Sequence, residues 1–151
     1  MIFDRTQQDV DNAIRIRAEK VQTGLSLSEK EIEILERGTM TINTINRIEE
    51  AQDALKNIFN DMGYWNTPTS NKHWNGDEIF TKEDFERIVK NLGVLKNAFF
   101  VFANTPETPK ARYDYESLNA IEKILNDLDL MINDVKSHYR ECGTFECGGD
   151  I

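Results

Sequence analysis

Residues 45–59 read INRIEEAQDALKNIF, and two later stretches, FERIVKNLGVLKNAF at 85–99 and LNAIEKILNDLDLMI at 118–132, repeat their apolar pattern. In this alignment apolar residues coincide at the first position and at offsets of 3, 10 and 14 residues from it. Positions with these offsets lie on one side of an α-helix. Each stretch is therefore predicted to form a long helix with the same buried stripe. Together the three predict a helical bundle, with loops long enough for an up-down arrangement.

Capping signals place the helix ends. The spacing of the capping box, in which the N-cap and N3 residues satisfy each other's backbone groups, occurs at Thr6 with Asp9, at Ser28 with Glu31 and at Thr81 with Asp84. Glycines and loop residues then predict helices over about 7–23, 29–37, 42–61, 82–102 and 114–139. The predicted fold class is all-α, with three long helices and two shorter N-terminal helices in a bundle domain over 1–140. A short extended, β-like tail is expected over 141–151.

The overall composition narrows the function classes. Of the 151 residues, 27 are acidic and 18 are Lys or Arg, which gives a formal net charge of −9. A binder that follows nucleic-acid phosphates needs a basic stripe, so no nucleic-acid partner is expected. No apolar run is long enough to cross a bilayer, and the first residues lack the apolar region of a signal peptide. We expect a protein made in the cytoplasm, with no membrane partner and no cofactor.

Polar residues repeat beside the apolar stripe. The spacing of Asn46 and Glu49 recurs in the third stretch, and the predicted buried network comprises Asn46, Glu49, Arg87, Asn91, Asn119 and Glu122. In the expected arrangement, Arg87 lies between two carboxylates and the asparagines complete the hydrogen bonds. Such a fully paired network is tolerated inside a bundle and can fix helix register. Facing glutamates also occur in di-iron bundles, but the Glu-x-x-His spacing of those sites is absent here. A metal site and carboxylate catalysis are therefore the weaker interpretations, and no enzyme is expected.

The loop over 64–80 and the tail are the candidate contact segments. The loop carries Tyr64, Trp65, His73 and Trp74, which either form an exposed contact surface or cover one end of the bundle. The tail contains ECGTFECG at 141–148, with Cys142, Phe145 and Cys147. Two cysteines without further ligands do not make a zinc site, and a reducing cytoplasm disfavours a disulfide. An extended segment that pairs with a neighbouring chain is the preferred interpretation.

Several stretches together resemble a known group. They are MIFDRTQQDVDNAIRIR at 1–17, LERGTMTINTINRIE at 35–49, YWNTPTSNKHWNGDEIFTKEDFERIVKNLGVLKNAF at 64–99, YESLNAIEKILNDLDLMI at 115–132 and the CGTFECGG ending. The chain resembles small proteins and modules from prophages of clostridia and related Firmicutes, which are similar to tail- or baseplate-associated structural proteins. The resemblance implies a multi-copy or homo-oligomeric component of a phage tail or contractile particle, whose partners are other tail or baseplate proteins. It supplies no catalytic residues.

Two further functions compete with this expectation. The aromatic loop is compatible with a module that binds cell-wall carbohydrate on the host surface, because exposed aromatic rings stack on sugars. The excess of acidic residues is compatible with a decoy that mimics DNA, although lysines and arginines are interleaved with the acids along the repeats.

Overall fold

The structure is a computed structural model that describes residues 1–65 and 68–142, with the backbone alone for residues 139–142. Within these ranges the chain forms helices and no strand, which confirms the all-α class. The helices are α1 (Gln7–Thr23), α2 (Glu29–Gly38), α3 (Ile42–Asp61), α4 (Lys82–Ala98) and α5 (Tyr115–Cys142). None of these described helices combines the length and the apolar character that a membrane span needs.

The helix starts follow the capping signals of the sequence. All three predicted capping boxes form, with Thr6, Ser28 and Thr81 as the N-cap residues of α1, α2 and α4. Asp114 accepts a hydrogen bond from the Ser117 N–H at 2.7 Å, so it opens α5 as predicted. Such a cap stabilises a helix by about 1 kcal/mol. Local sequence therefore determines where these helices begin.

Two predicted helix ends are wrong. The helix expected to reach Phe102 ends at Ala98, because the chain becomes extended at Phe99 and the Phe99 ring stacks on Phe59 in the core at a centroid distance of 4.9 Å. The last helix continues to Cys142 instead of stopping near Tyr139. Residues 143–151, the rest of the predicted extended tail, lie outside the described residues.

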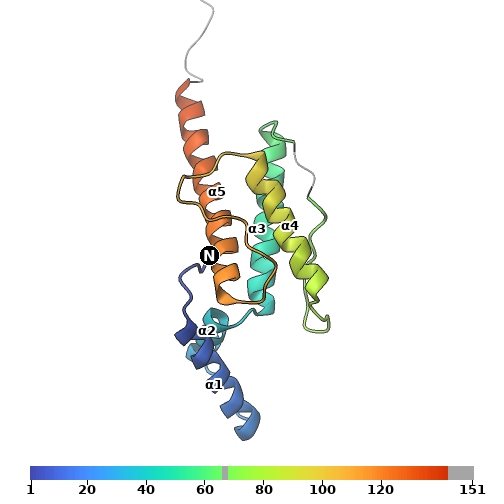
Figure 1. Ribbon diagram of the computed structural model, residues 1–151, viewed down its shortest axis with the longest axis vertical. Helices are drawn as coiled ribbons and strands as arrows, with labels where there is room; N and C mark the ends of the chain where they lie inside the picture. Colours follow the sequence, from blue (N-terminus) through green and yellow to red (C-terminus); the bar gives the residue numbers. More distant parts are fainter. Residues whose placement is uncertain (66–67, 143–151) are drawn as a thin grey trace, which may run out of the picture.

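Helices α3, α4 and α5 run in the same direction, which corrects the expected up-down arrangement (Figure 1). Pairs along α3 and α4 demonstrate this: Gln52 donates to the Ile88 carbonyl at 2.8 Å, and Phe59 stacks on Phe99. The loops between the helices return along the helices to the opposite end. In the second loop, Thr105 donates to Asp127 at 2.7 Å. Long return loops make parallel neighbours possible, and the loop lengths alone did not distinguish this topology from an up-down bundle.

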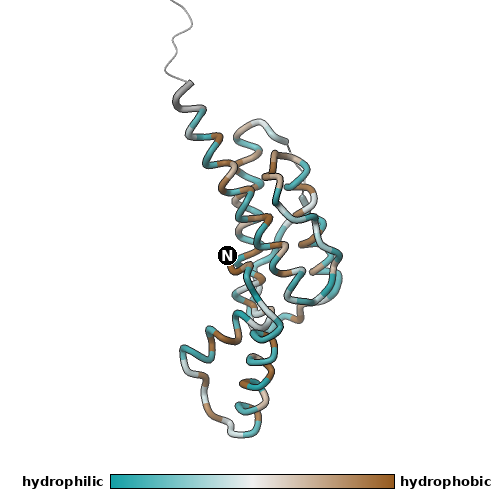
Figure 2. The backbone as a smooth tube through the Cα atoms, turned by 60° about the vertical axis from the view of Figure 1, so that its left-hand side comes forward, coloured by the Kyte–Doolittle hydropathy of each residue, from teal (hydrophilic) through white to brown (hydrophobic). Residues whose placement is uncertain are grey.

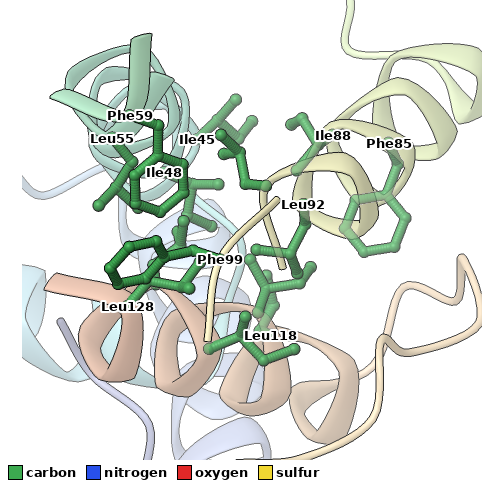
Figure 3. Packing of buried hydrophobic residues seen from close by; sticks show 14 of the residues in the cluster. Ile45, Ile48, Leu55, Phe59, Phe85, Ile88, Leu92, Phe99, Leu118 and Leu128 are labelled. Carbon is green, nitrogen blue, oxygen red and sulfur yellow. The ribbon is translucent and has the colours of Figure 1, made fainter. Parts of the chain in front are cut away.

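The parallel direction explains the aligned apolar stripe. Every residue at the aligned positions is buried in one cluster, which Figure 3 shows between the three helices: 45/85/118, 48/88/121, 55/95/128 and 59/99/132. Parallel helices with the same pattern bring matching positions to similar heights, so each triplet supplies side chains to the same part of the core. Each buried Leu, Ile or Phe side chain contributes about 1.5–3 kcal/mol. We call α3, α4 and α5 the three-helix core.

Helices α1 and α2 form a separate antiparallel hairpin at one end of the three-helix core (Figure 1). Gly38 lies against α1 so closely that a Cβ atom there would stand 2.1 Å from the Asp9 carbonyl oxygen and 2.5 Å from the Ala13 Cβ. Close approach of the two helices therefore requires glycine at this position. Residues 1–5, the N-terminal segment, run beside α5 before α1 begins (Figure 1).

Candidate functional site

The buried polar residues of α3 bind the loop that follows this helix. Glu49 is 1% exposed and accepts both terminal nitrogens of Arg87 at 2.7 Å each. It also accepts the Lys72 N–H at 2.7 Å and the Trp74 indole N–H at 2.8 Å. Asn46 bonds both backbone groups of Trp74, accepting its N–H at 2.7 Å and donating to its carbonyl at 2.9 Å. We call Asn46 and Glu49 the first Asn–Glu site.

The corresponding residues of α5 bind the N-terminal segment in the same way. Glu122 is fully buried and accepts Arg47 at 2.7 Å, Arg5 at 3.2 Å and the Ile2 N–H. Asn119 accepts the Arg5 N–H at 3.1 Å and donates to the Arg5 carbonyl at 2.9 Å. We call Asn119 and Glu122 the second Asn–Glu site. Each site thus uses an asparagine to bond both backbone groups of one residue, and a glutamate to bind that residue's side chain and a nearby N–H.

The predicted single network is corrected by this arrangement. Arg87 pairs with Glu49, whereas Glu122 pairs with Arg47 and Arg5. Arg47 occupies the repeat position that Arg87 occupies in the second stretch. Each glutamate therefore binds the equivalent arginine of a neighbouring helix, Arg87 of α4 for Glu49 and Arg47 of α3 for Glu122, which separates the network into two copies. The sequence prediction missed Arg47 and Arg5, although alignment of Arg47 with Arg87 was a signal for the former.

Asn91 has a related role on α4. It accepts the Thr69 N–H at 2.9 Å and donates to the Thr69 carbonyl at 2.9 Å, further along the loop that the first Asn–Glu site binds. The same loop is bound at Lys72, which pairs with Asp84 at 2.7 Å. Burial raises the pKa of Asp84, but hydrogen bonds from Lys72 and Thr81 outweigh it and lower the pKa to about 2. Hydrogen bonding to Glu49, against an opposing effect of burial, raises the pKa of Arg87.

The carboxylates of Glu49 and Glu122 are bonded to other groups of the protein. Both buried glutamates accept hydrogen bonds from arginine side chains and from backbone N–H groups, so their oxygens already have partners within the protein. Among the described residues, no group of three or more His, Cys, Asp or Glu side chains is placed to hold a metal ion. The chemistry of the Asn–Glu sites is therefore the fixing of extended chain segments onto parallel helices.

The aromatic residues of the first loop do not form one surface. Trp74 is only 4% exposed and packs edge-on against Phe80 with a centroid distance of 5.1 Å, so its predicted role as a contact residue is wrong. The Trp74 ring can be buried against α3 because its indole N–H donates to the Glu49 carboxylate there. His73 is exposed and its Nδ1 lies 3.6 Å from a Glu50 oxygen. Of the two tryptophans, Trp65 alone is exposed, at 84%.

A different aromatic group lies where α3 and α4 end. Tyr64 packs edge-on against Phe99 at 4.9 Å, and Phe99 contacts Phe100 at 5.8 Å. Phe99 is buried, while Phe100 is 69% exposed and Trp65 follows Tyr64 in the chain. We call Tyr64, Trp65, Phe99 and Phe100 the aromatic end. The sequence prediction missed Phe100 because it extended the helix to 102. In the structure the helix ends at Ala98, and in the extended chain that follows, Phe99 points into the core while Phe100 points to solvent.

The remaining predicted contact residues belong to the tail. Cys142 is the last residue of α5, with a helical backbone. Phe145 and Cys147 lie outside the described residues, so the predicted pairing of this segment stays a prediction.

A cleft of about 430 Å³ lies where the hairpin meets the three-helix core. Its wall includes Arg5 and Arg37, together with Tyr113 and Tyr115. Arg5 pairs with Glu122, and Arg37 pairs with Asp4 and Asp9 at 3.2 and 3.3 Å. Both arginines of the cleft are thus already bound to carboxylates, which makes the aromatic end the better candidate for contact with another molecule.

Comparisons with protein-family models, with curated proteins and with solved structures find no match for the chain.

Proposed function

We propose that this protein is a non-enzymatic structural component of a phage tail, baseplate or phage-tail-like contractile particle. In this proposal the helical bundle acts as a rigid body, and the aromatic end contacts another particle protein. The observation that carries the proposal is the exposure of Phe100, which contacts the buried Phe99, and of Trp65, which follows Tyr64 in the chain. Exposed aromatic side chains are enriched at the centres of protein interfaces and supply much of their binding energy.

The internal polar sites support the same role. Their charged side chains bond the loop and the N-terminal segment to the helices. This bonding makes the bundle rigid and leaves few unbonded charged groups for catalysis. A rigid body keeps its contact surface in place at little entropic cost on assembly. Residues 143–151 are proposed as a second contact segment, an arm that docks on a neighbouring subunit.

Incorporation into particles tests the proposal. A Trp65→Ala, Phe100→Ala double variant is expected to be folded and to appear in purified particles at about a tenth of the normal copy number or less, since two such anchors contribute about 2 kcal/mol or more. Ile79→Ala is the matched control, because Ile79 is also 84% exposed but lies before α4, outside the aromatic end. Normal incorporation of the double variant would refute the aromatic end as a contact surface.

Carbohydrate binding is a second candidate, favoured by the exposed Trp65 next to Tyr64. Two neighbouring rings can form a stacking platform for a sugar. Titration of the protein with soluble cell-wall glycan fragments, followed by tryptophan fluorescence, distinguishes the candidates. The assembly proposal expects no saturable change, whereas saturable binding that is lost in Trp65→Ala would favour the carbohydrate module.

A further inference from the structure

The second Asn–Glu site holds the N-terminal segment in the way that a protein holds a bound peptide. Asn119 bonds both backbone groups of Arg5, and the buried Glu122 accepts the Arg5 side chain at 3.2 Å and the Ile2 N–H. Arg5 is only 3% exposed, so the site encloses its side chain. In peptide recognition, main-chain hydrogen bonds supply affinity and a side-chain pocket supplies specificity. The second site has both elements.

The two Asn–Glu sites differ in how their bound segments are joined to the three-helix core. The first site binds Trp74, in a loop that is continuous with α3 on one side and with α4 on the other. The second site binds a segment that reaches the core along the chain only through the α1–α2 hairpin. Figure 2 shows this hairpin standing clear of the three-helix core. The second segment is therefore the less constrained of the two.

The hairpin itself is weakly attached to the three-helix core. Within the described residues, the hydrogen bonds from residues 1–38 to this core come from Ile2 and Arg5, apart from an exposed bond that Asn43 donates to Glu36 at 2.9 Å. The cleft of about 430 Å³ lies at this same junction, so the hairpin and the core are not closely packed there.

The connection between α2 and α3 is short and extended. It consists of residues 39–41, and the backbone is extended at both Thr39 and Thr41. A change of backbone angles in this connection can turn residues 1–38 away from the core as one piece. The bonds at the second Asn–Glu site are then the main contacts that hold these residues in place.

We infer that the second Asn–Glu site of one copy binds the N-terminal segment of a second copy of this chain, in a reciprocal exchange of residues 1–38. The contacts in the structure select this occupant, because Asn119 and Glu122 fit Arg5 and its backbone. All bonds between the segment and the site form again in the exchanged dimer, since identical residues meet. Reciprocal exchange closes into a two-fold dimer and leaves neither site empty.

Concentration sets the balance between the closed chain and the exchanged dimer. The bonds at the site are the same in both, whereas a tethered segment is present at its own site at an effective concentration on the order of millimolar. Free chains at micromolar concentration are therefore expected to be closed, and copies held side by side are expected to exchange. The inference rests on the proposed function for this proximity of copies, and it names a second copy as one partner.

Binding of a synthetic peptide tests the site. The receiver is the full chain with Arg5→Glu, because Glu122 repels the new carboxylate while Arg47 still pairs with Glu122. Fluorescence anisotropy of a labelled peptide of residues 1–8 is expected to show saturable binding to this chain. Binding should weaken about tenfold or more when the peptide carries Arg5→Ala, or when Asn119→Ala is added to the receiver. No saturable binding to a receiver with a wild-type circular dichroism spectrum would overturn the inference.

Refolding of the wild-type chain tests the exchange itself, without any variant that has to fold. The chain is unfolded in urea and refolded in a reducing buffer, and size-exclusion chromatography with light scattering measures its mass. Refolding at about millimolar concentration is expected to give a dimer, and refolding at about micromolar concentration a monomer. Arg5→Glu is expected to stay monomeric at both. Arg17→Glu, the same charge change at an exposed position on α1, is expected to behave as the wild type.

A wild-type chain that is monomeric at every refolding concentration, or a dimer that Arg5→Glu also forms, would overturn the inference. Both experiments use the purified chain and neither involves the aromatic end. Failure of the exchange is therefore distinguishable from failure of the proposed function, which is measured by incorporation into particles.

Discussion

Arg47 on α3 pairs with Glu122 on α5 at 2.7 Å, and this contact repeats, between equivalent positions, the pair of Arg87 on α4 and Glu49 on α3. Both arginines are third in their aligned stretches, and both glutamates are fifth. Helices that run in the same direction bring these positions to similar heights, whereas an antiparallel neighbour would separate them. The repeat in the sequence therefore encodes helix register through ion pairs as well as through apolar side chains.

Loss of the Glu122 charge is expected to destabilise the fold strongly. Glu122→Gln leaves the buried Arg5 and the partly exposed Arg47 without their carboxylate, and breaking a buried pair such as Arg5 with Glu122 costs about 3–5 kcal/mol. Urea denaturation followed by circular dichroism measures the difference in free energy of unfolding. Glu33→Gln, an exposed site, serves as the control and should change stability by about 0.5 kcal/mol or less. Equal stability of the two variants would contradict the pairing.

Each Asn–Glu site is expected to fix its own segment. Asn119→Ala removes both bonds to the Arg5 backbone, so hydrogen exchange of the Arg5 N–H should accelerate while the Trp74 N–H stays protected. Asn46→Ala should do the reverse. The cost of each variant is about 1–3 kcal/mol, because backbone groups lose their partners. If either variant accelerates exchange at both amides equally, the two sites are one cooperative network after all.

Truncation of the two tryptophans is expected to have very different effects on stability. Trp74→Ala removes a buried ring and leaves Glu49 without the indole donor, at a cost of about 3–5 kcal/mol. Trp65→Ala, at an exposed position, should alter stability by about 0.5 kcal/mol or less. Thermal unfolding of both variants under the same conditions compares them. A stable Trp74→Ala chain would show that the loop does not pack as described.

Acid is expected to destabilise the protein partly through Asp84. Hydrogen bonds from Lys72 and Thr81, acting against burial, lower its folded-state pKa from 3.8 to about 2. A lowered pKa contributes stability above the unfolded-state value, and this contribution disappears as pH falls from about 4 to about 2. Asp84→Asn should therefore reduce the slope of stability against pH across this window, as measured by urea denaturation at several pH values.

Asp77→Asn, at an exposed position in the loop before α4, is the control and should leave that slope unchanged. An Asp84→Asn chain with the full wild-type slope would assign the acid sensitivity to other carboxylates.

Much of the fold follows from local signals in the sequence. The capping boxes at Thr6, Ser28 and Thr81 and the stripe that contains Ile48 and Ile88 were predictable, because caps and helical periodicity depend on nearby residues. The direction of the helices was not, since long loops permit either. The site was predictable only in part: the repeat of Asn46 with Glu49 at a second position indicated a buried polar role.

The partners of that repeat were harder to predict. Arg5 reaches Glu122 across 117 residues of sequence, and such long-range pairing leaves no local pattern. Trp74 shows the converse problem, because an aromatic residue in a polar loop has the same local signature whether it is buried or exposed. Only the tertiary position of the Glu49 carboxylate decides between the two.

The most direct test of the proposed function is quantitative mass spectrometry of purified phage-like particles from a strain that carries this chain. The proposal predicts that the chain is present in the particles in a fixed ratio to a known tail protein, as tail symmetry requires. The ratio should fall sharply in the Trp65→Ala, Phe100→Ala strain and stay constant in the Ile79→Ala strain. Particles that are assembled and complete but contain none of this chain would contradict the proposal.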